Sequence, residues 1–213
     1  MNTAKNVKIV NHFTVRIEGE KILYSDPFHV KAAPQDGDII LITHEHHDHL
    51  SPEDIRKVAK REAWIVLPKS CREAAAKAGL SDRRLLFLSA GEEADVLGAL
   101  IKAVPAYNVN KQFHTRERGW LGYVVTMNGL RYYIAGDTDD NKDVRQVQCD
   151  VAIVPVGGTY TMTAEEAAEL VNSIRPAVAV PAHYGDIVGT KEDAERFAAL
   201  LSRDIACDFA RGE

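Results

Sequence analysis

The segment THEHHDHLSP, residues 43–52, contains four of the eight histidines of this 213-residue chain. The apolar, β-branched run DIILIT (38–43) leads into it and is typical of a buried strand. Ser51 and Pro52 are typical of a helix N-terminus, with Ser51 as the N-cap and Pro52 at the first helical position. We therefore expect a histidine-rich loop between a buried strand and a helix.

The spacing within this loop has a physical reason. His44 and His46 are two residues apart, so in extended backbone their side chains point to the same side and can bind one ion together. Asp48 and His49 come after the chain turns toward the helix and can bind a second ion beside the first. Imidazole and carboxylate ligands suit zinc, and also manganese or iron. A solvated polar loop is the alternative, but it leaves three imidazoles and a carboxylate directly after a buried strand unexplained.

Predicted strands and helices alternate along the rest of the chain, without a linker or a low-complexity segment. We expect strands at 7–10, 13–18, 21–25, 38–43, 63–68, 85–89, 99–107, 122–127, 131–136, 150–156, 177–182 and 205–209, and helices from 52 and over 71–79, 164–174 and 191–202. Asn128-Gly129 predicts a hairpin turn, and Thr163 with Glu166 predicts a capping box. The polar stretch 108–119 is typical of a surface loop.

Composition limits the class of protein. An apolar content of 46% in 213 residues suits one domain over residues 1–213. The net charge of -5 argues against a nucleic-acid partner and against a polybasic membrane patch, although a small anionic substrate could still meet a locally positive site. No apolar run approaches the roughly 20 residues of a membrane span, and the N-terminus lacks the apolar core of a signal peptide. We therefore expect a cytoplasmic protein.

The three cysteines indicate neither a thiolate metal site nor a disulfide framework. Cys71, Cys149 and Cys207 are far apart and form no Cys-x-x-Cys pair. Polar residues instead follow three predicted strands at the point where each ends: the 44–49 cluster, Asp137 and His183. Because open sheets place ligand sites at the carboxyl ends of strands, we expect these three segments to converge.

In this order, these residues resemble the metallo-β-lactamase superfamily. Its HxHxDH signature stands here as His44-x-His46-x-Asp48-His49. Asp26-Pro27, Gly136-Asp137 and the His183 of Pro181-Ala182-His183-Tyr184 match further family motifs. The similarity covers nearly the whole chain. It is closest to the branch that contains ascorbate-6-phosphate lactonase and N-acyl phosphatidylethanolamine phospholipase D.

The resemblance implies a four-layer αββα sandwich, with two mixed sheets face to face, helices outside, and the site at one edge between the sheets. It also implies two metal ions. The first is held by His44 and His46, the second by Asp48, His49 and His183, and Asp137 bridges them. A metal-bound hydroxide would be the nucleophile, and Asp48 could also accept a proton as a catalytic residue.

One position departs from the family pattern. The third histidine ligand of the first metal falls where this chain has Asn108. His114, six residues on, could fold back into the site, or it could be an ordinary surface-loop residue. If neither residue binds, the sequence fits an enzyme with a single metal ion.

Residues around the expected site have weaker indications. Asp26 could accept the second N–H of a ligating histidine or could serve only in a turn. Tyr160, in Gly157-Gly158-Thr159-Tyr160, could reach the substrate or belong to a turn before the helix cap. His12 matches the position of a Gly-His near the site mouth in related proteins, but here the glycine is absent. Three cations could meet a phosphate or carboxylate or form a solvated charge cluster: Lys111, Arg116 and Arg118.

The expected function is hydrolysis of a small ester, lactone or phosphodiester with one or two zinc ions. Fold alone does not choose among these bonds, and a small polar or anionic metabolite is our preferred substrate. Two other classes stay open. The chain could be a metal-binding sensor or scaffold without turnover, which the Asn108 position permits, or a di-iron redox protein, although such relatives carry a fused flavin domain. The chain could also form a homo-oligomer.

Overall fold

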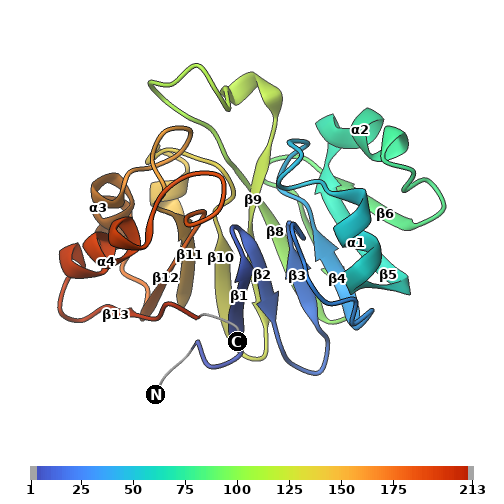
Figure 1. Ribbon diagram of the computed structural model, residues 1–213, viewed down its shortest axis with the longest axis horizontal. Helices are drawn as coiled ribbons and strands as arrows, with labels where there is room; N and C mark the ends of the chain where they lie inside the picture. Colours follow the sequence, from blue (N-terminus) through green and yellow to red (C-terminus); the bar gives the residue numbers. More distant parts are fainter. Residues whose placement is uncertain (1–3, 211–213) are drawn as a thin grey trace.

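The first half of the chain forms a six-stranded mixed sheet in the computed structural model, which describes residues 4–210 (Figure 1). Its strands are β1 (Val7–Asn11), β2 (Thr14–Ile17), β3 (Leu23–Ser25), β4 (Gly37–Leu41), β5 (Ala59–Pro68) and β6 (Arg84–Leu88). They lie side by side in chain order. The first three pair antiparallel, and β3 to β6 pair parallel.

The second half forms a seven-stranded mixed sheet. Its strands are β7 (Glu93–Val96), β8 (Ala99–Pro105), β9 (Leu121–Met127), β10 (Leu130–Ile134), β11 (Val151–Pro155), β12 (Val178–Ala182) and β13 (Ala206–Cys207). Pairing is antiparallel from β7 to β10 and parallel from β10 to β13. The short helices η1 (Lys69–Cys71), η2 (Arg116–Arg118) and η3 (Val144–Gln146) lie in connections.

The two sheets pack face to face, and helices cover their outer faces (Figure 1). The helices α1 (Pro52–Val58) and α2 (Arg72–Lys77) pack on the first sheet, and α3 (Ala164–Ile174) and α4 (Lys191–Leu200) pack on the second. The expected four-layer αββα sandwich is therefore confirmed. No helix within residues 4–210 is long and apolar enough to cross a membrane.

Strand alternation explains why the strand before the histidine cluster is apolar throughout. Ile39 and Leu41 point into the core between the sheets, whereas Ile40 and Ile42 point into the core under α1 and α2. Successive side chains of a strand face opposite sides, so a strand buried on both faces needs an uninterrupted apolar run. All four side chains are fully buried.

Several local signals are confirmed. The Ser51 side chain accepts a hydrogen bond from the backbone N–H of Asp54 at the start of α1. Thr163 and Glu166 form the capping box of α3. Asn128 and Gly129 have φ values of 54° and 75°, as a tight hairpin turn between β9 and β10 requires.

Two elements differ from the sequence expectation. Strand β7 (Glu93–Val96) was not expected, because only Val96 of its four residues is buried and the segment lacks an apolar pattern. Strand β5 begins at Ala59 rather than at residue 63. Its first residues include the exposed charges Lys60, Arg61 and Glu62, which do not identify a strand by composition.

Candidate metal centre

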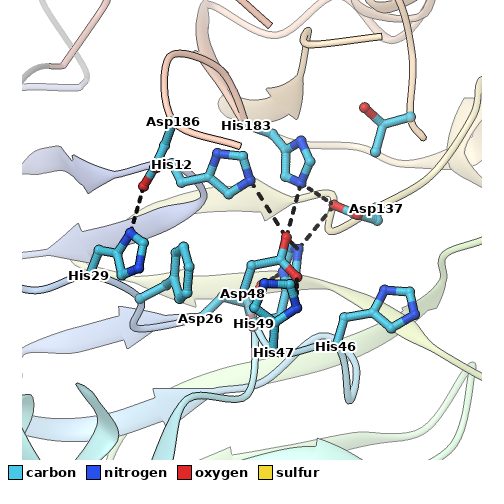
Figure 2. Close-up of polar contacts among 12 residues, drawn as sticks. His12, Asp26, His29, His46, His47, Asp48, His49, Asp137, His183 and Asp186 are labelled. Carbon is cyan, nitrogen blue, oxygen red and sulfur yellow. Dashed lines mark hydrogen bonds and ion pairs between the residues drawn. The ribbon is translucent and has the colours of Figure 1, made fainter. Parts of the chain in front are cut away.

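Residues of the candidate site follow strands that run in the same direction. In the first sheet β1, β3 and β4 are codirectional, and in the second sheet β8, β10 and β12 are. His12 directly follows β1 and Asp26 directly follows β3, while His183 directly follows β12. The expected convergence of the 44–49 segment, Asp137 and His183 at one edge is observed (Figure 2).

One group of potential ligands contains three histidines. The ligand atoms of His44, His46 and His114 all lie within 4.8 Å of one another. His44 Nε2 is 3.0 Å from His46 Nδ1. Asp137 closes the group, because its Oδ2 lies 3.2 Å from His114 Nε2 and 4.0 Å from His44 Nε2. The polar loop thus brings His114 back to the histidine pair that precedes α1.

Figure 2 shows a second group, in which His49 and His183 both contact Asp137. His49 Nε2 and His183 Nε2 are each 3.3 Å from Oδ1 of Asp137. Oδ2 of Asp48 lies 3.4 Å from His49 Nε2 and 3.7 Å from His183 Nε2. The two carboxylate oxygens of Asp137 therefore face two different sets of histidines.

The buried polar atoms of the site fit a cation. His49 Nε2, His114 Nε2, His183 Nε2 and Asp137 Oδ1 are buried and have no hydrogen-bond partner within residues 4–210. A buried polar atom without a partner costs about 1–3 kcal/mol, and native proteins seldom leave several together. Divalent cations bound between these nitrogen and oxygen donors would satisfy them all, and the donor set is one that zinc accepts.

The charges of the site are consistent with this reading. Burial lowers the pKa of His44 well below its usual value and lowers the pKa of His46, which favours the neutral imidazole that a metal requires. Burial alone would raise the pKa of Asp137, but His183 and His49 hold it well below its usual value. Burial alone would also raise the pKa of Asp48, but the contacts with His12 and His183 lower it. The two carboxyl groups therefore stay ionised in a buried site.

Asp26 contacts the Nδ1 atom of His49 and so orients its ring. Its Oδ2 lies 2.8 Å from His49 Nδ1, and its Oδ1 accepts a 2.8 Å hydrogen bond from the backbone N–H of Thr43. The Thr43 hydroxyl donates to the same carboxylate at 2.7 Å. Burial alone lowers the pKa of His49, yet Asp137 and Asp26 together raise it well above its usual value.

Asn108 is buried beside the site, and its side-chain Oδ1 has no hydrogen-bond partner within residues 4–210. Its backbone N–H donates to the carbonyl of His114 at 2.7 Å. Its side-chain Nδ2 donates to the carbonyls of Phe113 at 3.0 Å and Tyr160 at 2.7 Å. Asn108 therefore shapes the loop that presents His114.

His12, which the family resemblance placed near the site mouth, lies in the site and forms a group of potential ligands with Asp48 and His183. Its ring is fully buried, its Nε2 is 3.6 Å from Asp48 Oδ2, and its ring centroid is 3.9 Å from that of His183. Burial lowers its pKa, and Asp48 opposes that shift in part. The strand pattern 7–10 alone gives no sign that the next turn delivers a histidine to the site.

Four of the site residues have backbone in the left-handed region, with φ of 47° at His12, 44° at Asp26, 57° at His114 and 59° at His183. This conformation is uncommon for residues other than glycine and costs on the order of 1–3 kcal/mol where the surroundings enforce it. Such positions concentrate at functional sites, and the sequence does not reveal them.

A cavity of about 310 Å³ opens onto both ligand groups. Its lining includes the buried Asp48, His114, Asp137 and His183 and the more exposed Phe113, Tyr160 and Ile187. Tyr160 thus lies where the sequence allowed it to meet a substrate. A larger hollow of about 720 Å³ lies over β8 and β9 and contains none of the potential ligands.

Comparison with known proteins identifies relatives whose similarity covers most of the chain. Residues 6–183 match a family model described as the beta-lactamase superfamily domain. The chain is 33% identical over 211 residues to a UPF0173 metal-dependent hydrolase from Thermoplasma acidophilum, covering 92% of this chain and 91% of the relative.

Solved structures agree. A crystal structure named as a metal-dependent hydrolase from Parabacteroides distasonis superposes with a TM-score of 0.82 at 31% identity, covering 95% of this chain and 90% of the other. Igni18, a metallo hydrolase from Ignicoccus hospitalis, has the same fold, with a TM-score of 0.76 at 21% identity over 97% of this chain and 95% of its own.

Proposed function

Since this chain belongs to the metallo-β-lactamase superfamily, we propose that it is a metal-dependent hydrolase that cleaves a small ester, lactone or phosphodiester. The cavity of about 310 Å³ lies at the low end of the ~300–1,000 Å³ typical of small-molecule pockets, which supports a small substrate.

The proposed ligands form two sets that share Asp137. His44, His46 and His114 would hold one ion, and a second set would hold the other: Asp48, His49 and His183. Zinc suits these donors best, and manganese or iron is also compatible with them. When bound, such ions would acidify a water molecule and polarise the bond to be cleaved.

The observation that carries this proposal is the orientation of Asp137. Its Oδ2 lies 3.2 Å from His114 Nε2, while its Oδ1 lies 3.3 Å from both His49 Nε2 and His183 Nε2. A side chain that served only as a buried ion-pair partner would not need each oxygen aimed at a separate histidine set. A carboxylate shared between two cations could use one such oxygen for each.

The chain's own residues would supply orientation and proton transfer. Asp26 would fix the ring of His49 through Nδ1, so that Nε2 stays directed at Asp48 and Asp137. Asp48 is 9% exposed and lines the cavity, so its carboxylate could accept a proton from a water molecule held there. His12 would position Asp48, because within residues 4–210 Asp48 is the carboxylate that His12 contacts at ion-pair distance.

Metal removal and return tests the proposal. The purified protein is stripped with a chelator and assayed with ester, lactone and phosphodiester substrates before and after addition of zinc, manganese or iron(II). We expect turnover of at least one class to require added metal and to be lost in Asp137→Asn. His29→Gln serves as a matched histidine control, since the His29 side chain is 59% exposed and is in none of the ligand groups. A fully metallated protein without turnover would favour a metal-binding sensor or scaffold.

A further inference from the structure

Apolar side chains from three separate loops line the exposed part of the site cavity, together with the imidazole of His47. Phe113 lies between β8 and β9, Tyr160 between β11 and α3, and Ile187 between β12 and α4. These side chains are 51%, 36% and 41% exposed and are among the few large hydrophobic side chains that stay exposed. Their meeting around one cavity therefore needs an explanation beyond the chance exposure of single residues.

Two of these side chains are held in a fixed arrangement. The rings of Phe113 and Tyr160 pack edge to face, with centroids 5.0 Å apart and an interplanar angle of 85°. The Asn108 side chain donates hydrogen bonds to the backbone carbonyls of both residues. The loop contacts therefore set the positions of Phe113 and Tyr160. Both side chains line the cavity.

The cations of the same loop are turned to other partners. Lys111 pairs with Asp139 and lies 3.6 Å from Glu166. Arg116 lies 3.3 Å from Asp143, with its guanidinium 5.2 Å from the centre of the Tyr107 ring. Each charge is therefore balanced by a carboxylate rather than left for a ligand.

The third cation of the loop behaves in the same way. Arg118 lies 4.0 Å from Glu45 and 5.6 Å from the centre of the Trp120 ring. Within residues 4–210, no lysine or arginine lines the cavity. Proteins that recognise phosphate or carboxylate groups place arginine or lysine against them. The cavity therefore offers no lysine or arginine to the anionic substrate that the sequence analysis preferred, and only the proposed metal ions would meet its charge.

We propose that the wall formed by Phe113, Tyr160 and Ile187 binds the apolar acyl or alkyl group of an uncharged ester or lactone, whose carboxyl carbon reaches the candidate metal centre. The proposal rests on the proposed hydrolase function and selects among its three substrate classes. Burial of an apolar chain against half-exposed side chains provides affinity, since that surface leaves water when substrate binds.

The test uses metal-loaded protein and matched substrates. 4-Nitrophenyl acetate, butyrate and hexanoate vary the acyl chain, and bis(4-nitrophenyl) phosphate supplies a phosphodiester with the same reporter group. γ-Butyrolactone and γ-decanolactone extend the comparison to cyclic esters. Metal-stripped protein gives the background rate. The readout is the ratio of kcat/KM between the long and the short member of each series, which a general loss of activity does not change.

We expect kcat/KM to rise roughly tenfold from acetate to hexanoate, and the phosphodiester to be the poorer substrate. Phe113→Ala and Ile187→Ala should each bring the hexanoate-to-acetate ratio close to one. Leu100→Ala is the control, because Leu100 is 40% exposed on β8 and does not line the site cavity. That variant should keep the wild-type ratio.

Two failures can be told apart. Metal-dependent turnover that favours the phosphodiester, or ratios that neither wall variant changes, would overturn the apolar-substrate inference and leave the hydrolase proposal standing. Absence of metal-dependent turnover with every substrate of the panel would overturn the hydrolase proposal and the inference with it.

Discussion

Nδ1 of His49 lies 2.8 Å from Oδ2 of Asp26, and neither side chain is exposed to solvent. Because one ring nitrogen is engaged in this contact, the other, Nε2, is free to face Asp48 and Asp137. A carboxylate behind a histidine fixes the tautomer and the orientation of a ring that binds metal. Through this contact Asp26, at the end of β3, orients a histidine of the candidate metal centre.

Asp26→Asn should weaken metal binding without removing any proposed ligand. The amide is close in shape to the carboxylate but loses the charge that favours a donating Nδ1–H on His49. We expect zinc affinity to fall by about 10- to 100-fold, measured by competition with a chromophoric chelator. Unchanged zinc affinity in a folded Asp26→Asn protein would show that the contact serves the fold alone.

His114→Ala should remove one ligand of the first proposed ion. The expected result is a lower zinc stoichiometry, measured by mass spectrometry of the metal content, together with loss of activity. His29→Ala is the matched control, since it removes a mostly exposed histidine from outside the ligand groups. Full zinc stoichiometry and full activity in His114→Ala would return His114 to the class of ordinary loop residues.

Asn108→Ala should loosen the loop that carries His114 and Phe113. The substitution removes two hydrogen bonds to backbone carbonyls, at 3.0 Å and 2.7 Å. Each such bond contributes about 1 kcal/mol. We therefore expect faster amide hydrogen exchange over residues 108–119 and weaker zinc binding, with little change elsewhere. Exchange at the wild-type rate in this loop would contradict the role given to Asn108.

His12→Ala should lower kcat/KM while the zinc stoichiometry is retained, because His12 is proposed to position Asp48 rather than to bind metal. His12→Gln, whose amide places a hydrogen-bond donor on the side of Asp48, should recover part of the activity. Metal analysis and steady-state kinetics on both variants decide the matter. Loss of zinc from both proteins would instead make His12 a ligand.

Asp54→Asn should destabilise the protein at pH 7. The carboxylate accepts 3.0 Å hydrogen bonds from the backbone N–H groups of His29 and Val30, and Lys57 Nζ lies 3.0 Å away. Burial alone would raise the pKa of Asp54, but Lys57, Ser51 and the Val30 N–H lower it below its ordinary 3.8. We expect a loss of about 1–3 kcal/mol in the free energy of unfolding.

The pH dependence of this loss follows from the lowered pKa. A folded-state pKa below that of the unfolded chain stabilises the protein above pH 4, and the stabilisation disappears as the pH falls through the folded value. The difference between wild type and Asp54→Asn in urea unfolding should therefore be largest at neutral pH and shrink toward pH 3. A difference that stays constant over this range would contradict the charge-based explanation.

The parts of the fold that follow from local periodicity were predictable from sequence. The DIILIT run, the Asn128-Gly129 turn and the Thr163 capping box each determine their own structure within a few residues. Strand β7 was not predictable, because Glu93–Val96 is an edge strand whose pairing with β8 depends on backbone hydrogen bonds rather than on an apolar pattern. The assignment of residues 1–213 to one domain stays a prediction.

The candidate site also contains some residues that were predictable from sequence and others that were not. His44, His46, Asp48 and His49 share one loop, so their spacing alone predicts one ion between the first two residues and a second ion at the other two. His114 and His12 reach that site only through long-range contacts and left-handed backbone, neither of which leaves a pattern in the sequence. Their place near the other ligands depends on tertiary structure, as the Asn108 hydrogen bonds illustrate.

The central claim is that two histidine sets share Asp137 around bound cations. Anomalous diffraction at the zinc absorption edge, from crystals of the zinc-loaded protein, tests it most directly. We expect one peak within about 2.0–2.3 Å of nitrogens of His44, His46 and His114, and another at similar distance from His49, His183 and Asp48. An ordered, zinc-loaded structure without any peak among these side chains would contradict the account.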